Sequence, residues 1–292
     1  MSAIDTASDT GLDLRPIKEK ASFNWGNPVV YFIALLLVAV TLAPIFWIVM
    51  SGFSDNSQMT IDPSRWPNPF ILDNYANILH SPEFWKPAAN SVIAAVSTTA
   101  GVVVFGVMAA FVLARYDFRG RGFLYALFAA GLMFPMSVAV TPLYFIILNI
   151  GLMNNLLGVI LPVIAFALPT TIIILVPFLR AIPKELEEAA MLDGTSRMGF
   201  FWRIVVPLSV PGLITVGILA FVASWNGYML PLFILDPSNA TLPLSVTQFS
   251  TAHTQDTASV LAFTSLSMIP ALVFFSLFER RIVGGLTGAV KG

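Results

Sequence analysis

The stretch Glu185-Leu-Glu-Glu-Ala-Ala-Met-Leu-Asp-Gly194 is the most charged segment inside an otherwise apolar chain. At the period of an α-helix, Leu186, Ala189 and Ala190 share one stripe with the preceding Ile182, while charged side chains cover the other faces. Acidic side chains in the first turn are favoured by the helix dipole. The stretch therefore predicts a short amphipathic helix within a mostly apolar protein.

The residues at both ends of this stretch set its limits. Pro183 is tolerated at the first position of a helix, and Gly194 readily takes the left-handed conformation that ends one. Thr195 or Ser196 can then cap a second short helix, whose aromatic side chains suit a membrane interface: Phe200, Phe201 and Trp202. We expect a helix, a turn and a second helix that lie flat on a bilayer.

Composition places the chain among polytopic membrane proteins. Hydrophobic residues make up 57% and charged residues 11%, against about 45–50% and about 25% in soluble domains. There is no cysteine, which excludes disulfides and thiolate metal sites, and no Gly-x-x-x-x-Gly-Lys-Ser/Thr phosphate loop, which excludes a P-loop ATPase. The histidines His80 and His253 are isolated in loops, so we assign no catalytic site and no metal site.

Six apolar segments are long enough to cross the roughly 30 Å of hydrocarbon in a bilayer. They are Val29–Ser51, Ser91–Ala114, Phe123–Leu148, Leu156–Leu179, Ile204–Leu235 and Ser259–Phe278. The predicted fold class is therefore an all-α polytopic membrane protein with six transmembrane helices. One membrane domain covers residues 29–279, between a polar N-terminal tail, 1–28, and a C-terminal tail, 280–292, whose glycines disfavour a stable helix.

Small residues and prolines inside the spans concern packing. The run Gly106-Val-Met-Ala-Ala110 has the small-xxx-small spacing that allows two helices to approach closely. Prolines recur within the proposed spans, and bundle packing can satisfy the carbonyls that they leave free. We interpret these prolines as sites of kinks rather than as ligand sites.

The lysines and arginines indicate how the chain is oriented. Of the 15 in the sequence, all but Arg65 and Lys86 fall on one side of the six proposed spans. The positive-inside rule then places both termini and the loop 181–203 in the cytoplasm.

Neutral polar side chains inside the spans are candidates for a solute path. No ionisable side chain falls within the six proposed spans, which argues against a proton-coupled carrier and an intramembrane hydrolase. A hydroxyl-rich sugar requires hydrogen bonds and an aromatic face, which the candidates for lining a path would supply: Ser137, Thr141, Thr170, Ser224, Trp225 and Asn226. The alternative is that the hydroxyls bond neighbouring helices or their own backbone.

Several separate motifs resemble one family. Glu188-Ala-Ala190, with Gly194 four residues later and then Ile204 and Pro207, resembles the cytoplasmic loop of binding-protein-dependent ABC importer permeases. The longer run Ile182–Ala190 resembles the carbohydrate branch, the maltose-type second permease subunits. Two further runs are similar to the family, Ala114–Gly120 and Leu242–Phe249, and the C-terminal Arg280–Gly292 is similar to the carbohydrate branch.

This resemblance implies a type I ABC importer permease fold, in which the loop 181–203 carries a coupling helix between spans four and five. The residues implied in coupling to an ATPase are Glu185, Glu188, Ala189, Ala190, Asp193 and Gly194. It also implies a second homologous permease chain, an ATPase dimer that holds ATP and Mg²⁺, and an extracytoplasmic solute-binding protein. The chain itself would bind no cofactor, catalyse no reaction, and reside in a bacterial cytoplasmic (inner) membrane.

The resemblance further implies a sugar as the cargo, alternating access as the mechanism, and a loop at residues 236–257 that reaches toward the binding protein. Within the same class, the alternative cargo is a glycerophosphodiester or a polyol. Outside it, the alternatives are an ion-coupled secondary transporter and a membrane scaffold without transport activity. Uptake that survives ATP depletion would select the secondary transporter.

Overall fold

The computed structural model describes residues 28–253 and 256–290, with side chains as far as Phe274 and at Ser276. All regular elements within these ranges are helices, which confirms the all-α part of the predicted fold class. The chain separates into two units, divided between Pro44 and Ile45. The first unit contributes the beginning of α1, and the second contains every later element. The predicted N-terminal tail lies outside the described residues, apart from Pro28.

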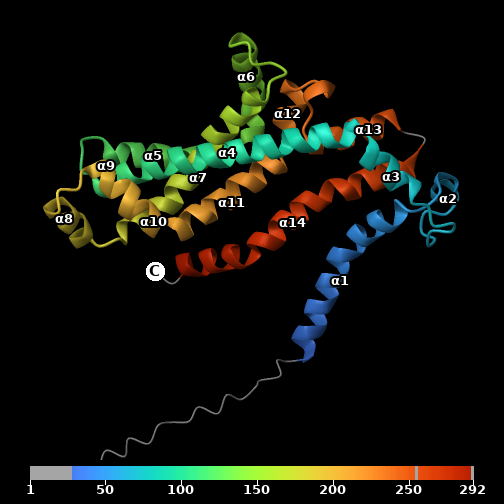
Figure 1. Ribbon diagram of the computed structural model, residues 1–292, viewed down its shortest axis with the longest axis horizontal. Coiled ribbons are helices and arrows are strands. Elements are labelled where there is room, and N and C mark those ends of the chain that lie inside the picture. The colour runs from blue at the N-terminus through green and yellow to red at the C-terminus, as the bar shows by residue number, and fades with distance from the viewer. Residues whose placement is uncertain (1–27, 254–255, 291–292) are drawn as a thin grey trace, which may run out of the picture. The chain divides into compact units, whose positions relative to one another are not determined.

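The helices follow one another along the chain and are joined by short connections (Figure 1). Several of these connections contain proline or glycine. The bounds of the helices are α1 Pro28–Ser51, α2 Asn56–Ile61, α3 Asp73–His80, α4 Pro82–Arg115, α5 Arg121–Gly131, α6 Met136–Asn149, α7 Leu156–Arg180, α8 Lys184–Leu192, α9 Arg197–Phe200, the π-helical segment η1 Phe201–Val205, α10 Val206–Leu208, α11 Val210–Trp225, α12 Met229–Ile234, the 3-10 segment η2 Pro237–Asn239, α13 Leu242–Ala252 and α14 Thr257–Val290.

Within the described ranges, four helices are long and apolar enough to cross a membrane: α1, α4, α7 and the part of α14 at Thr257–Phe274. Two more spans are counted only if each of two bent helix pairs is taken as one span. The pair of α5 and α6 is bent by 102°, and the pair of Arg197–Leu208 and Val210–Trp225 by 76°. The expected count of six continuous spans is therefore not confirmed.

The third predicted span breaks at Pro135. The ring of Pro135 has no N–H to donate and disfavours helical backbone at the preceding Phe134, so the chain leaves α5 and starts again as α6. Pro135 itself is extended, with φ of −73° and ψ of 134°. As a result, α6 leaves the layer formed by α4, α5 and α7 (Figure 1).

The predicted fifth span, Ile204–Leu235, is also discontinuous. Pro207 and Pro211 flank a break at Ser209, and neither can donate the hydrogen bond that would continue a helix. At the break, the Val205 carbonyl accepts from the Ser209 hydroxyl at 2.6 Å and from the Ser209 amide at 2.9 Å. Downstream, α11 ends at Trp225 and a short α12 follows after Asn226.

The helix α4 is the centre of the second unit and lies beside α7 and α11 (Figure 1). Close approach to α7 depends on Gly106, because a Cβ built there would lie 2.3 Å from Cγ2 of Thr171. Ala110, one turn further along, is fully buried. The small-xxx-small spacing thus marks a helix contact, as the sequence predicts.

The predicted non-helical C-terminal tail is wrong as far as the structure describes it. Helix α14 continues past the expected end of span six to Val290. Each glycine in a helix costs about 1 kcal/mol, but extending an existing helix avoids the much larger cost of nucleating a new one. Residues 291 and 292 lie outside the described ranges.

Candidate functional site

The charged stretch that begins at Glu185 forms most of α8, and the end of this helix has a well-defined hydrogen-bond pattern. The Thr195 amide donates to the Ala190 carbonyl at 2.9 Å, and the Gly194 amide donates to the Met191 carbonyl at 3.0 Å. Gly194 has a φ of +76°, as this pattern requires and as the sequence predicts. Ser196, rather than Thr195, caps α9, since its Oγ accepts from the Gly199 amide at 3.1 Å.

The side chains of α8 divide differently from the predicted stripe. Ala190 is buried together with the preceding Ile182, but Leu186 and Ala189 are exposed. Apart from the buried Ala190 and the partly buried Glu187, the side chains of α8 are exposed. The outward apolar side chains, called here the α8 patch, are Leu186, Met191, Leu192 and Met198.

The predicted coupling residues are distributed over this exposed surface. Glu185, Glu188, Asp193 and Gly194 are all exposed and lie in α8 or directly after it. Of the six predicted coupling residues, Ala190 alone is buried. Acidic groups beside the α8 patch form a surface that is suited to contact with another protein, because it combines apolar area with charge.

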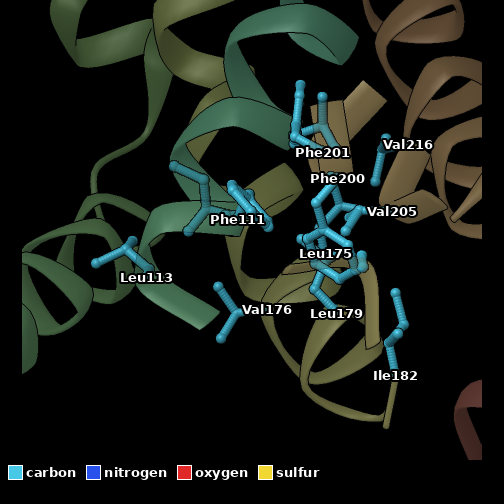
Figure 2. Close-up of a cluster of buried hydrophobic side chains, with 14 residues drawn as sticks. Phe111, Leu113, Leu175, Val176, Leu179, Ile182, Phe200, Phe201, Val205 and Val216 are labelled. Atoms are coloured by element: carbon cyan, nitrogen blue, oxygen red, sulfur yellow. The ribbon is translucent and has the colours of Figure 1, made fainter. Parts of the chain in front are cut away.

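The second helix of the loop lies in the core. Phe200 and Phe201, predicted at a membrane interface, are 1% and 2% exposed, whereas Trp202 is about half exposed. Both phenylalanines pack on Phe111 of α4, with ring centres 6.4 Å and 4.9 Å apart (Figure 2). The π-helical turn of η1 lets these two successive side chains face the same neighbour. The expectation of an interfacial position was wrong for this pair.

A buried arginine joins α4 to the start of α8. The side chain of Arg115 is 3% exposed, and its Nη1 lies 3.9 Å from Oε2 of Glu187. Its Nη2 donates to the Ile182 carbonyl at 2.8 Å. Sequence reasoning used Arg115 only to orient the chain and treated Glu187 as a residue on the outer faces. The one signal for Arg115 was its position directly after an apolar span, and that position does not identify the groups that Arg115 contacts.

The next residue, Tyr116, contacts the start of α9. The Arg197 guanidinium carbon lies 5.3 Å from the centre of the Tyr116 ring, a cation–π arrangement. Burial raises the pKa of the Tyr116 hydroxyl above its usual value, and the Glu187 carboxylate raises it further, against opposing effects of Arg197 and Arg115. The ring therefore stays neutral at physiological pH. We call the last turn of α4, the last turn of α7, α8, α9 and η1 together the α8 end.

A cavity of about 580 Å³ lies between the two interrupted segments. Its wall comes from the break between α5 and α6, the first half of α7, α11, and the connection from α11 to α12. Of the predicted path residues, the structure brings Ser137, Thr170, Ser224 and Asn226 together in this wall. Non-helical backbone at membrane depth is tolerated where it lines such a cavity.

The hydroxyls and amides of the wall differ in whether they already have partners. Thr171, also in the wall, donates to the Ala167 carbonyl at 2.8 Å, and Ser224 Oγ lies 3.3 Å from Thr98 Oγ1. No side-chain hydrogen bond is found for Ser137, Thr170 or Asn226 among the described residues, and all three are exposed. These three side chains are therefore available to a polar solute.

Two predicted path residues lie elsewhere. Thr141 is exposed on α6 but does not belong to the cavity wall. Trp225 is 5% exposed and stacks on Phe221, with ring centres 5.7 Å apart. Its ring is buried in a cluster with residues of α13 and α14, because α11 ends there and these helices cover it. Trp225 accordingly offers no aromatic face to the cavity.

Comparison with known proteins identifies relatives along most of the chain. Residues 102–284 match the family described as binding-protein-dependent transport system inner membrane component. The chain is 39% identical to a trehalose transport system permease of Mycobacterium tuberculosis, over 88% of this chain and 95% of that one. It is 33% identical to a diacetylchitobiose uptake system permease of Streptomyces coelicolor, over 87% and 86%. It is also 34% identical to a trehalose/maltose transport system permease of Thermococcus litoralis, over 89% and 95%.

Solved structures agree on the fold. A bacterial ABC transporter involved in the import of the acidic polysaccharide alginate matches with a TM-score of 0.74 at 23% identity, over 87% of this chain and 95% of that one. A second alginate transporter structure, in complex with its pentasaccharide-bound periplasmic protein, matches with a TM-score of 0.62 at 14% identity, over the same shares. The fold is that of an ABC transporter permease. From its matched residues and its relatives, the chain belongs to the family of binding-protein-dependent transport system inner membrane components.

Proposed function

We propose that the chain is a permease subunit of an ATP-driven importer of a carbohydrate. Relatives at 33–39% identity are named for uptake of diacetylchitobiose, trehalose and maltose. The partners would be a second permease chain, an ATPase dimer that binds ATP and Mg²⁺, and an extracytoplasmic solute-binding protein. The distribution of lysine and arginine supports a position of both termini and α8 in the cytoplasm.

The observation that carries this proposal is the surface of α8. It is a helix with a fixed end at Gly194, whose exposed side combines the α8 patch with Glu185 and Glu188. This surface lies on a helix at the ends of α4 and α7. It is suited to docking in a cleft of a partner protein that changes shape. Glu188 is the residue proposed to make the polar contact with the ATPase.

The cavity is proposed as this chain's part of the sugar path. Its available polar groups, Ser137, Thr170 and Asn226, are neutral, and they can donate to and accept from sugar hydroxyls. The breaks after α5 and α11 allow its wall to change shape when the helices move, as alternating access requires. In this mechanism, closure of the ATPase dimer moves α8. The membrane helices that are connected to α8 then move and open the cavity to the extracytoplasmic side.

The test is co-purification and reconstitution. The tagged chain is expressed with its neighbouring genes, either intact or with residues 185–194 replaced by a Gly/Ser linker. We expect an ATPase and a second permease to co-purify with the intact chain only. We also expect vesicles containing that complex and its binding protein to take up sugar only with ATP.

A different result would contradict the proposal. If the intact chain purifies alone and moves solute without ATP, the chain is a secondary transporter. If its complex takes up a glycerophosphodiester or a polyol but no sugar, the importer class stands and the cargo is wrong.

A further inference from the structure

The end of α4 is linked by polar contacts to the start of α5, to α8 and to α9. Arg115 reaches the Ile182 carbonyl and Glu187, and Tyr116 lies under the Arg197 guanidinium. Arg121, at the start of α5, donates from Nε to the Leu113 carbonyl at 2.9 Å. Helices α5, α8 and α9 therefore meet at the end of α4, and α8 and α9 come from a distant part of the sequence.

Helix α8 lies between two short connections that are not regular structure. It is joined to α7 by Ala181, Ile182 and Pro183, and to α9 by the residues from Asp193 to Ser196, neither of which is regular structure. Within α8, Ala190 is the buried residue, and its methyl group is a small anchor. The contacts that can fix the direction of α8 are those at its two ends.

Arg115 supplies the polar contact at the first end. Its charge is buried, and a buried charge is stable only when nearby groups hold it. One contact goes to the backbone just before α8 and the other to Glu187, one turn into α8. Two points of attachment, on either side of Pro183, restrict both the position and the rotation of the helix.

We propose that Arg115 is a positioning residue that fixes α8 to α4, so that a displacement of α8 moves α4 rather than being absorbed by the flanking connections. The inference rests on the proposed function, since it assigns the route by which motion of α8 reaches the spans. Glu187 is its partner on α8, and its role differs from that of the exposed Glu188.

The first test measures coupling in the reconstituted complex. The variants are Arg115→Gln, Glu187→Gln and Arg115→Lys, with Arg119→Gln as the matched control because Arg119 is exposed in the loop that follows α4. We expect Arg115→Gln to hydrolyse ATP but to import about tenfold less sugar per ATP, as expected when a charge-assisted hydrogen bond is lost. Glu187→Gln and Arg115→Lys should fall between Arg115→Gln and the parent, and Arg119→Gln should match the parent. Unchanged sugar per ATP in both Arg115→Gln and Glu187→Gln would overturn the proposal.

A second test does not depend on transport. Because the chain has no cysteine, Leu192→Cys can carry a single spin label at the exposed end of α8 in the full chain, held in lipid nanodiscs. We expect Arg115→Gln and Glu187→Gln to raise the mobility of the label, and Arg119→Gln to leave it unchanged. A label whose mobility is the same in all variants overturns the positioning role, even in a chain that transports sugar. A rise in mobility without any ATP-dependent uptake by the parent complex would instead refute the proposed function alone.

Discussion

The α8 end and the cavity are built on the same long helices, but they use their polar groups in opposite ways. At the α8 end, Arg115 and Tyr116 are engaged with groups from other elements. In the cavity wall, Ser137, Thr170 and Asn226 are exposed, and no side-chain hydrogen bond is found for them among the described residues. Polar groups that are paired inside the protein hold its parts together, whereas unpaired ones are open to a solute.

The backbone shows the same contrast. Near the α8 end, α4 and α7 are continuous, and Phe200 and Phe201 fill the space between them (Figure 2). At the cavity, the segments that form the wall are interrupted after Gly131 and after Trp225. Continuous, packed helices transmit a displacement, and interrupted ones can bend where they are broken. The difference suits an end that receives motion and a wall that opens.

The largest expected effect is at the contact between the two regions, where Gly106 meets Thr171. Gly106→Val should separate α4 from α7, because the added Cβ would lie 2.3 Å from Cγ2 of Thr171 and cannot be accommodated unless the Thr171 side chain or the helices shift. Overpacking of this kind costs on the order of 1–3 kcal/mol or more. The yield of monodisperse protein and its melting temperature in detergent are the measurements.

Gly122→Ala is the control for this prediction, since no atom lies within 4 Å of a Cβ built at Gly122. Equal melting temperatures for Gly106→Val and the parent would show that the contact between α4 and α7 is looser than described.

The second prediction concerns the turn after α8. Gly194→Asp should block uptake while the protein stays in the membrane, because a side chain at a φ of +76° is strained by about 1 kcal/mol or more. It also places a second carboxylate beside Asp193, at a helix C-terminus where the dipole disfavours negative charge. No atom lies within 4 Å of a Cβ built at Gly194, so the effect does not come from a clash.

Gly194→Asn isolates the effect of the charge, since asparagine has nearly the same shape as aspartate and a similar tolerance of the left-handed conformation. We expect it to retain more uptake than Gly194→Asp in the same vesicle assay. Normal uptake by Gly194→Asp would count heavily against a coupling role for this turn.

The smallest of the three effects concerns the cavity. Asn226→Leu removes a side-chain amide from the cavity wall, at the start of the connection between α11 and α12. The side-chain volume changes little. We expect uptake at low sugar concentration to fall by about three- to tenfold, the value of one hydrogen bond, while sugar imported per ATP stays constant.

Thr141→Val is the matched control, because Thr141 is exposed on α6 outside the cavity wall. If the two substitutions reduce uptake equally, the cavity is not the path. If Asn226→Leu changes sugar per ATP instead, the cavity and the α8 end are not separable in function.

Rules that act within a few residues were enough to predict α8 and its end. Gly194 has the backbone conformation that its position predicts, and Ser196 caps α9 as one of two proposed residues. The same rules failed for the third and fifth spans. Hydropathy predicted apolar segments of the right length there, but it did not predict that the helices are interrupted. Pro135, Pro207 and Pro211 were visible in the sequence, but bundle packing decides whether a proline kinks a helix or ends it. Pro162 and Pro169, for instance, remain within the continuous α7.

The sequence by itself determined that this protein is an all-helical membrane permease, where its charged loop helix begins and ends, and which family it belongs to. Only the tertiary structure decided that Arg115 is buried against a carbonyl 67 residues away, that Trp225 faces the core, and that Ser137, Thr170 and Asn226 share one cavity. The physical reason is the separation along the chain of the residues that interact. Hydropathy, caps and left-handed turns depend on neighbouring residues, whereas burial and pairing depend on which distant segments pack together.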